Sequence, residues 1–195
     1  KMAVKSLRRV WVVIHGANPP EGEIENAIKI ASHIRSKINI VRVLPSDALA
    51  LDLLTKLANV VTVGGPIANE WAFKLNEYVN PKYDMTVLRE KTPEETWGDY
   101  IRSGAVEVHG FLKNTTKYAG VIGTGIIGVG TQRALRARPL RVIHVGGWGY
   151  CDTCAMGEAF RADAGQGVYE TGYTADIPTE EPCPVGATYR KIADP

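Results

Sequence analysis

The sequence has no long apolar run and few of the residues that cross-link or specialise a small protein. Only three of its 195 residues are cysteine, three are phenylalanine, and aromatic residues make up 8% of the chain. No apolar run approaches the about 18 residues that span a bilayer, so we expect no transmembrane segment. The formal net charge of +2 argues against a strongly basic nucleic-acid binder. The composition also excludes disorder, collagen and a disulfide-packed miniprotein, which leaves one globular domain with an appendage.

Charge and cysteine are unevenly distributed along the chain. Residues 151–195 carry eight acidic and three basic side chains, a net charge of −5, whereas residues 1–150 carry 20 basic and 13 acidic ones, a net charge of +7. All three cysteines lie in the acidic segment. We therefore predict an α/β domain over residues 1–145 and a loop-rich, acidic, cysteine-containing extension over residues 146–195.

The spacing of apolar residues predicts strands that alternate with helices in the first part of the chain. The predicted strands are 9–15, 39–44, 60–63, 83–88 and 140–145. The predicted helices are 22–37, 48–57, 67–78 and 131–137. This alternation predicts a three-layer, mainly parallel sheet of the Rossmann-like or flavodoxin-like kind. Alternating polarity at 104–113 and 118–122, with a turn at 113–117, predicts an inserted β-hairpin.

A glycine-proline turn follows the predicted strand 60–63. Gly64 and Gly65 permit a tight turn, Pro66 suits the first position of a helix, and the side chain of Asn69 can bond back to the turn. Two interpretations follow. The residues form only the turn and the helix start, or the exposed helix N-terminus also binds an anion.

A second glycine pattern, G-x-G-x-x-G, is formed by Gly123, Gly125 and Gly128 after the predicted strand 118–122. Such a loop between a strand and a helix is typical of a dinucleotide site, where the backbone approaches the pyrophosphate. The acidic residue that would hold the ribose is missing at the end of the next strand, since no acid precedes Asp152 there. A structural turn, another anion site and a dinucleotide-binding oxidoreductase all remain open.

The cysteines form one C-x-x-C pair and one distant partner. Cys151 and Cys154 follow a predicted strand, as in a thioredoxin-like redox site, but no further βαβ framework follows. Together with Cys183 and either His109 or His144 they match the ligand set of a Cys₃His zinc site. A structural disulfide with one free thiol, or three free thiols, is the other alternative.

The remaining candidate sites are scattered. Asn114 begins an N-x-[ST] triplet at the predicted hairpin tip, which is a glycosylation acceptor if the protein is exported. The four histidines show no metal spacing and lie near no evident Ser and Asp partners. We therefore expect no catalytic constellation.

Two of these turns together resemble a known family. The segment from Gly64 to Asn69, followed by Gly130, Thr131 and Ala134, resembles the "GGP-x-x-N … GT-x-x-A" α/β module of archaeal S-layer and related cell-surface proteins, over about residues 10–145. The resemblance implies a structural or adhesive module without catalytic residues, in which Gly123 also shapes a turn. It implies protein subunits as partners, in a homo- or hetero-oligomer. It also implies a location at the cell surface or outside the cell, with the cytoplasm as the alternative.

Overall fold

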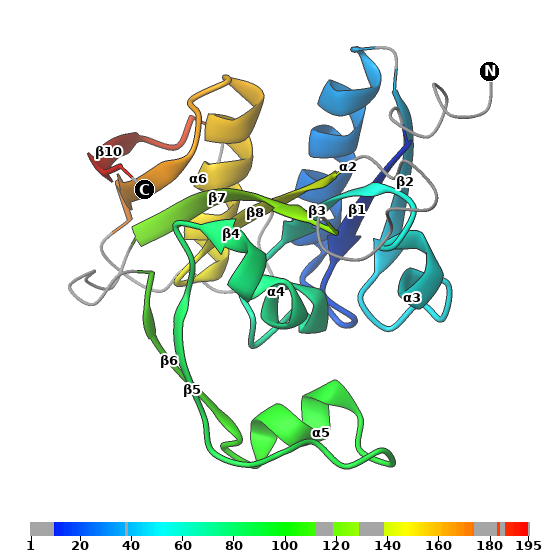
Figure 1. Ribbon diagram of the computed structural model, residues 1–195. Helices are drawn as coiled ribbons and strands as arrows, with labels where there is room; N and C mark the ends of the chain where they lie inside the picture. Colours follow the sequence, from blue (N-terminus) through cyan, green and yellow to red (C-terminus); the bar gives the residue numbers. More distant parts are fainter. Residues whose placement is uncertain are drawn as a thin grey trace, which may run out of the picture.

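The computed structural model describes residues 10–37, 39–111, 119–128, 139–173, 183 and 186–194, which form an α/β structure around a mixed eight-stranded sheet (Figure 1). In chain order its strands are β1 (Val10–His15), β2 (Ile40–Pro45), β3 (Asn59–Val63), β4 (Val79–Asn80), β7 (Ala119–Ile127), β8 (Leu140–Gly147), β9 (Gly167–Thr171) and β10 (Tyr189–Ala193). The helices are α2 (Glu21–Arg35), α3 (Leu51–Leu54), α4 (Glu70–Lys74), α5 (Trp97–Arg102) and α6 (Tyr150–Arg161), with a short 3₁₀ turn, η2 (Asn76–Tyr78). None of these described helices has the length and apolar character that crossing a membrane requires. The α/β class expected from the sequence is confirmed.

Four neighbouring strands, in the order β2-β1-β3-β8, run parallel. Successive residues of β1 point to opposite faces, so that Val13 packs with α2 and α6 while Val12 and Ile14 pack with α3 and α4. These strands read as continuous apolar runs because helices cover both of their faces. The carboxyl ends of the four strands lie at one edge of the fold.

The other half of the sheet is antiparallel, which corrects the expectation of a mainly parallel sheet. β7 runs antiparallel to β8, β9 antiparallel to β7, and β10 antiparallel to β9. Apolar spacing identifies a strand but carries no information on its direction. The sheet is therefore mixed, with the order β10-β9-β7-β8-β3-β1-β2.

Gly123 and Gly125 lie inside β7. One edge of this strand pairs with β8, and at these glycines the other edge changes its partner from β9 to β4. The first residues of β7 pair with β9, whereas Gly125 pairs with β4. A Cβ atom on Gly125 would overlap the carbonyl group of Tyr78, and one on Gly123 would overlap the carbonyl oxygen of Pro81. The two glycines thus let two backbones approach closely. They do not form the strand-to-helix loop that the sequence pattern predicts.

β5 (Asp84–Val87), α5 and β6 (Val106–Gly110) form an arm that projects from the main sheet (Figure 1). β6 pairs antiparallel with β5 in a separate two-stranded sheet, so the predicted hairpin between 104–113 and 118–122 is wrong. The pairing partner of β6 lies earlier in the chain than the pattern of alternating polarity indicates. Tyr100, which α5 contributes, is buried in the small apolar core of the arm.

The described residues between 146 and 194 include the helix α6 and the strands β9 and β10 of the same fold, where the sequence predicts a loop-rich extension. The predicted boundary at residue 145 falls inside β8, and α6 packs beside α2 on one face of the sheet. Small residues, including Ala155 and Ala159, make up most of the buried side of α6, beside the larger Met156. Gly157 lies so close to Asn26 of α2 that a Cβ atom there would overlap the amide group. Such small residues permit close helix packing but give little apolar periodicity.

Candidate ligand pocket at the carboxyl ends of β1, β3 and β8

A cavity of about 400 Å³, here called the pocket, lies at the carboxyl ends of three parallel strands. Three strand-to-helix connections and the base of the arm line it. The lining residues are Pro20 and Glu23 after β1, Gly65 to Ala68 after β3, Gly147 to Tyr150 and Thr153 after β8, and Tyr83 and Val108 from the arm. Open α/β sheets bind their ligands at this edge, outside the carboxyl ends of the strands.

Asn69 fixes the wall of the pocket that follows β3. Its side chain is fully buried, and its amide nitrogen donates to the carbonyl oxygens of Ile14 and Val63, both at 2.9 Å. Its amide oxygen accepts from the backbone N–H groups of Trp71 at 3.0 Å and Ala72 at 3.3 Å, which caps α4. One side chain therefore joins two strand ends to the helix that begins beside them.

Glu23 brings a carboxyl group into the pocket from the first turn of α2. The residue is 4% exposed, and its Oε1 atom accepts from the backbone N–H of Gly16 at 3.3 Å. Gly64 faces this carboxyl group and has a φ of +94°, a conformation that residues with a side chain rarely adopt. Burial raises the pKa of Glu23 to about 7, although the Gly16 hydrogen bond acts in the opposite direction. Near neutral pH the carboxyl group is therefore only partly ionised.

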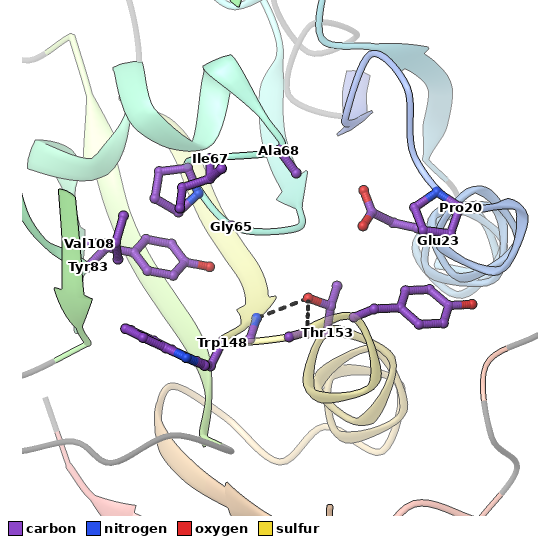
Figure 2. Close-up of a pocket in the computed structure, with 13 residues that line it drawn as sticks. Pro20, Glu23, Gly65, Ile67, Ala68, Tyr83, Val108, Trp148 and Thr153 are labelled. Atoms are coloured by element: carbon purple, nitrogen blue, oxygen red, sulfur yellow. Dashed lines mark hydrogen bonds between the residues drawn. The ribbon is translucent and has the colours of Figure 1, made fainter. Parts of the chain in front are cut away.

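Tyr83 lies across the pocket from Glu23, and the Glu23 carboxyl group and the Tyr83 hydroxyl group point toward one another in Figure 2. Asn76 holds the Tyr83 backbone: its amide nitrogen donates to the Tyr83 carbonyl at 2.8 Å, and its oxygen accepts from the Tyr83 N–H at 2.9 Å. Tyr83 is 2% exposed, and within the described part of the chain its hydroxyl group has no hydrogen-bond partner. Burial, and secondarily the nearby Glu23, raises the pKa of this hydroxyl above its ordinary value. A buried hydroxyl without a partner suits a site that a ligand completes.

The rest of the lining is mostly apolar and aromatic. Trp148 is 40% exposed at the mouth of the pocket, and Tyr150 follows it at the start of α6. The hydroxyl of Thr153 accepts from the Gly147 N–H at 3.1 Å and donates to the Gly149 carbonyl at 3.2 Å. Among the residues described as lining the pocket there is no lysine, arginine or histidine.

The buried carboxyl group predicts a specific pH dependence of stability. Glu23 has an ordinary pKa of 4.5 in the unfolded chain and a pKa of about 7 in the folded one, so the folded state binds more protons between these values. The free energy of unfolding should therefore fall as the pH rises through this window, with a slope of up to about 1.4 kcal/mol per pH unit. Urea unfolding of the protein and of Glu23→Gln across the window measures it. The variant should lack this decline, and curves of equal slope would refute the prediction.

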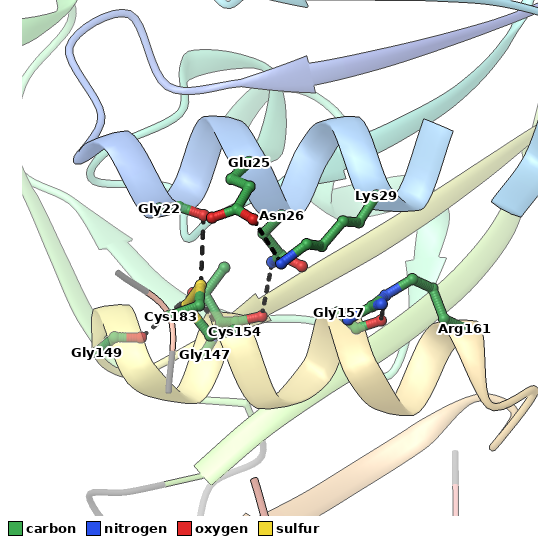
Figure 3. The surroundings of a disulfide bond; sticks show 11 residues. Gly22, Glu25, Asn26, Lys29, Gly147, Gly149, Cys154, Gly157, Arg161 and Cys183 are labelled. Atoms are coloured by element: carbon green, nitrogen blue, oxygen red, sulfur yellow. Dashed lines mark hydrogen bonds and ion pairs between the residues drawn. A yellow bond between two sulfur atoms is a disulfide. The ribbon is translucent and has the colours of Figure 1, made fainter. Parts of the chain in front are cut away.

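The structure pairs Cys154 with Cys183 in a disulfide (Figure 3), and Cys151 is a buried cysteine outside this bond. Of the sequence-based alternatives, this is the structural disulfide with one thiol left outside it. Cys151 and Cys154 are therefore not bonded to each other as a redox C-x-x-C pair would be, and the bonded sulfurs are not available as zinc ligands. His144, in β8, points to the face opposite α6, because alternate residues of a strand face opposite sides. His109 lies in the arm, beside Thr86.

The other predicted sites fall in different places. Gly128 follows the end of β7 with a φ of +88°, and no helix N-terminus is described next to it. Asn114, Gly130 and Thr131 lie outside the described residues, so the glycosylation and turn predictions for them stay predictions. The turn from Gly64 to Asn69 is the predicted site that forms part of the pocket.

Sequence reasoning missed Glu23 and Tyr83, the two central polar groups of the pocket. Glu23 lies four residues before Ala27 and seven before Ile30, on the buried face of α2. A charged residue in register with an apolar face is a signal that could have identified it. Tyr83 has no such signal, because it reaches the pocket only through the path of the chain after β4.

Comparison of this chain with protein-family models, curated proteins and solved structures found no match. The assignment of the pocket therefore depends on its geometry and chemistry.

Proposed function

We propose that this protein binds a small organic molecule in the pocket between β1, β3 and β8. The observation that carries the proposal is the pair of Glu23 and Tyr83, two buried polar groups that face one another across a mostly apolar cavity of about 400 Å³. Ligand pockets are typically concave and apolar, with a few polar groups that fix the orientation of the ligand. The unpartnered hydroxyl of Tyr83 is the kind of group that a ligand would satisfy.

The position of the pocket supports the same proposal. The four strands β2-β1-β3-β8 run parallel, and helices lie on both of their faces. In such sheets the loops that follow the strands form a crevice between neighbouring connections. Here those loops are short and fixed, since Asn69 anchors one of them and Thr153 anchors another.

Three probes of similar size and different charge test the proposal: phenethyl alcohol, phenethylammonium and hydrocinnamate. Each is titrated into the full chain while tryptophan fluorescence is followed, because Trp148 lies at the mouth of the pocket. Saturable binding of at least one probe is expected. In Gly65→Leu it should weaken about tenfold or more, because the leucine side chain fills the cavity.

Gly98→Leu is the matched control for this experiment. An added Cβ atom would have its nearest neighbour at 3.5 Å at both Gly65 and Gly98, so neither backbone must shift. Gly98 belongs to α5 in the arm and lies outside the pocket. Binding should be unchanged in this variant. If no probe binds, or if Gly65→Leu binds as well as the native chain, the proposed function is wrong.

In a second candidate function, the protein is a non-catalytic, S-layer-like module at the cell surface. It would act through contacts with other protein subunits. The Cys154–Cys183 disulfide supports it, because disulfides persist mainly in oxidising, extracellular compartments. Fractionation of the source cells, together with sedimentation velocity of the intact chain, tests this candidate. A cytoplasmic monomer would contradict it.

A further inference from the structure

We infer that the ligand of the pocket is an organic ammonium, a positively charged primary or secondary amine on an apolar or aromatic body. This inference depends on the proposed function and specifies its ligand. It combines three features of the pocket: the carboxyl group of Glu23, the unpartnered hydroxyl of Tyr83 and the aromatic side chains beside them.

The charge of the lining favours a cation. Glu23 is the one ionisable carboxyl group among the described lining residues, and no basic side chain accompanies it there. Its partner is a backbone N–H, that of Gly16, rather than a cation. A buried carboxylate without a cationic partner is costly, and an ammonium group supplies that partner. An anionic ligand would instead lie against this carboxylate with no basic residue to offset the repulsion.

The first turns of α2 and α6 do not reverse this preference. Helix N-termini attract anions, but acidic residues already occupy both of these turns. In α6 the carboxylate of Asp152 accepts from the backbone N–H of Gly149 at 2.8 Å, and in α2 the first turn carries Glu21 and Glu23. The positive ends of both helices therefore have negative side chains of their own.

The hydrogen-bonding groups and the rings fit the two parts of such a ligand. An ammonium N–H can donate to the Glu23 carboxylate, and a second one can donate to the Tyr83 hydroxyl oxygen, which then has a partner. The rings of Tyr83, Trp148 and Tyr150 line the same space. Aromatic faces attract cations and also pack against an apolar body. A quaternary ammonium lacks the N–H donors and would leave the Tyr83 hydroxyl unpartnered.

Binding of a cation should depend on the ionisation of Glu23. Below neutral pH the folded protein holds a proton on this carboxyl group, so an ammonium ligand must displace it. Glu23 loses this proton as the pH rises through about 7, whereas an alkylammonium such as that of lysine stays charged to about pH 9. The affinity for an ammonium ligand should therefore rise over this pH range. Burial, together with nearby charges that include Glu23, raises the pKa of Tyr83 before β5 and of Tyr150 on α6. The other titratable side chains on this part of α2 and at the adjoining ends of the elements packed against it are Glu21 and Glu25 on α2, His15 at the end of β1, and Cys151 and Asp152 on α6.

Calorimetric titration of the intact chain with phenethylammonium, phenethyl alcohol, hydrocinnamate and phenethyltrimethylammonium tests the inference. At a pH above 7 the primary ammonium should bind about tenfold more tightly than the alcohol or the quaternary ammonium, and hydrocinnamate should bind most weakly. Glu23→Gln should remove the preference for the ammonium over the alcohol and also its pH dependence. Tyr83→Phe should remove the preference for the primary over the quaternary ammonium.

Glu25→Gln is the matched control. Glu25 lies on the same helix, is half exposed and forms an ion pair with Lys29 at 2.7 Å outside the pocket. This variant should bind all four probes as the native chain does. If the alcohol or hydrocinnamate binds as tightly as phenethylammonium, or if Glu23→Gln keeps the preference, the inference is wrong while the proposed binding function stands. Absence of binding by every probe would overturn both.

Discussion

Replacing Cys154 and Cys183 together by serine is expected to lower the free energy of unfolding by about 3–4 kcal/mol, because the disulfide closes a long loop. The two cysteines are 29 residues apart in the sequence. In the chain-entropy model, a cross-link over that distance restricts the unfolded chain by about this amount. The bond also fixes Cys183 beside α2, where its sulfur lies 3.3 Å from the carbonyl oxygen of Gly22 (Figure 3).

Urea unfolding of the native chain, the double variant and Cys151→Ala measures this effect. Cys151 is a buried cysteine outside the disulfide, in the same helix as Cys154, so its replacement controls for the loss of a buried sulfur and should cost about 1 kcal/mol. A thiol titration of the denatured, unreduced protein should find one reactive thiol. Three reactive thiols, or equal destabilisation by Cys151→Ala, would contradict the disulfide's stabilising role.

Asn69→Ala is expected to lower the free energy of unfolding by about 3–5 kcal/mol, as the sum of a lost helix cap and two lost buried hydrogen bonds. The alanine leaves the carbonyl oxygens of Ile14 and Val63 without their side-chain donor and the N–H groups at the start of α4 without their acceptor. These groups are buried at the strand ends, where water replaces the amide poorly. The pocket wall should loosen at the same time, so that probe binding weakens as well.

Two further variants separate the parts of this effect. Thr96→Ala removes an exposed cap from α5, where the threonine oxygen accepts from the Asp99 N–H at 3.1 Å, and should cost only about 1 kcal/mol. Asn69→Asp keeps an acceptor for the cap but places a carboxylate against two carbonyl oxygens, so it should remain strongly destabilising. If Asn69→Asp is as stable as the native chain, Asn69 acts as a cap alone and the link between the strands is unimportant.

The parallel half of the fold could be predicted from the sequence because its signals are local and strong. The apolar runs at 9–15, 39–44, 60–63 and 140–145 match β1, β2, β3 and β8, and the predicted helix 22–37 matches α2 to within two residues at its C-terminus. Each of these elements packs at least one apolar face against its neighbours. Burial of that kind produces the periodicity by which an element is recognised.

The failures occur where close backbone approach replaces large apolar side chains. α6 buries cysteine, alanine and glycine, and β7 contains glycines at which another segment crosses. Gly125 therefore matches a dinucleotide motif although its role in the fold is to allow β4 to pair. The sequence did not predict the candidate site because its two central residues lie far apart along the chain. Glu23 and Tyr83 are separated by 60 positions in the sequence, and only the folded chain places them across one cavity.

The strand order also restricts how the chain can fold. β3, at residues 59–63, has β1 on one side and β8, at residues 140–147, on the other. During synthesis about 80 further residues must therefore be made before β3 can pair with its second neighbour, which takes on the order of several seconds. Until then an apolar strand has an unpaired edge that can pair with another chain. Because the residues after β8 also line the pocket, the pocket cannot form before they are made, and binding competence coincides with completion of the parallel half of the sheet.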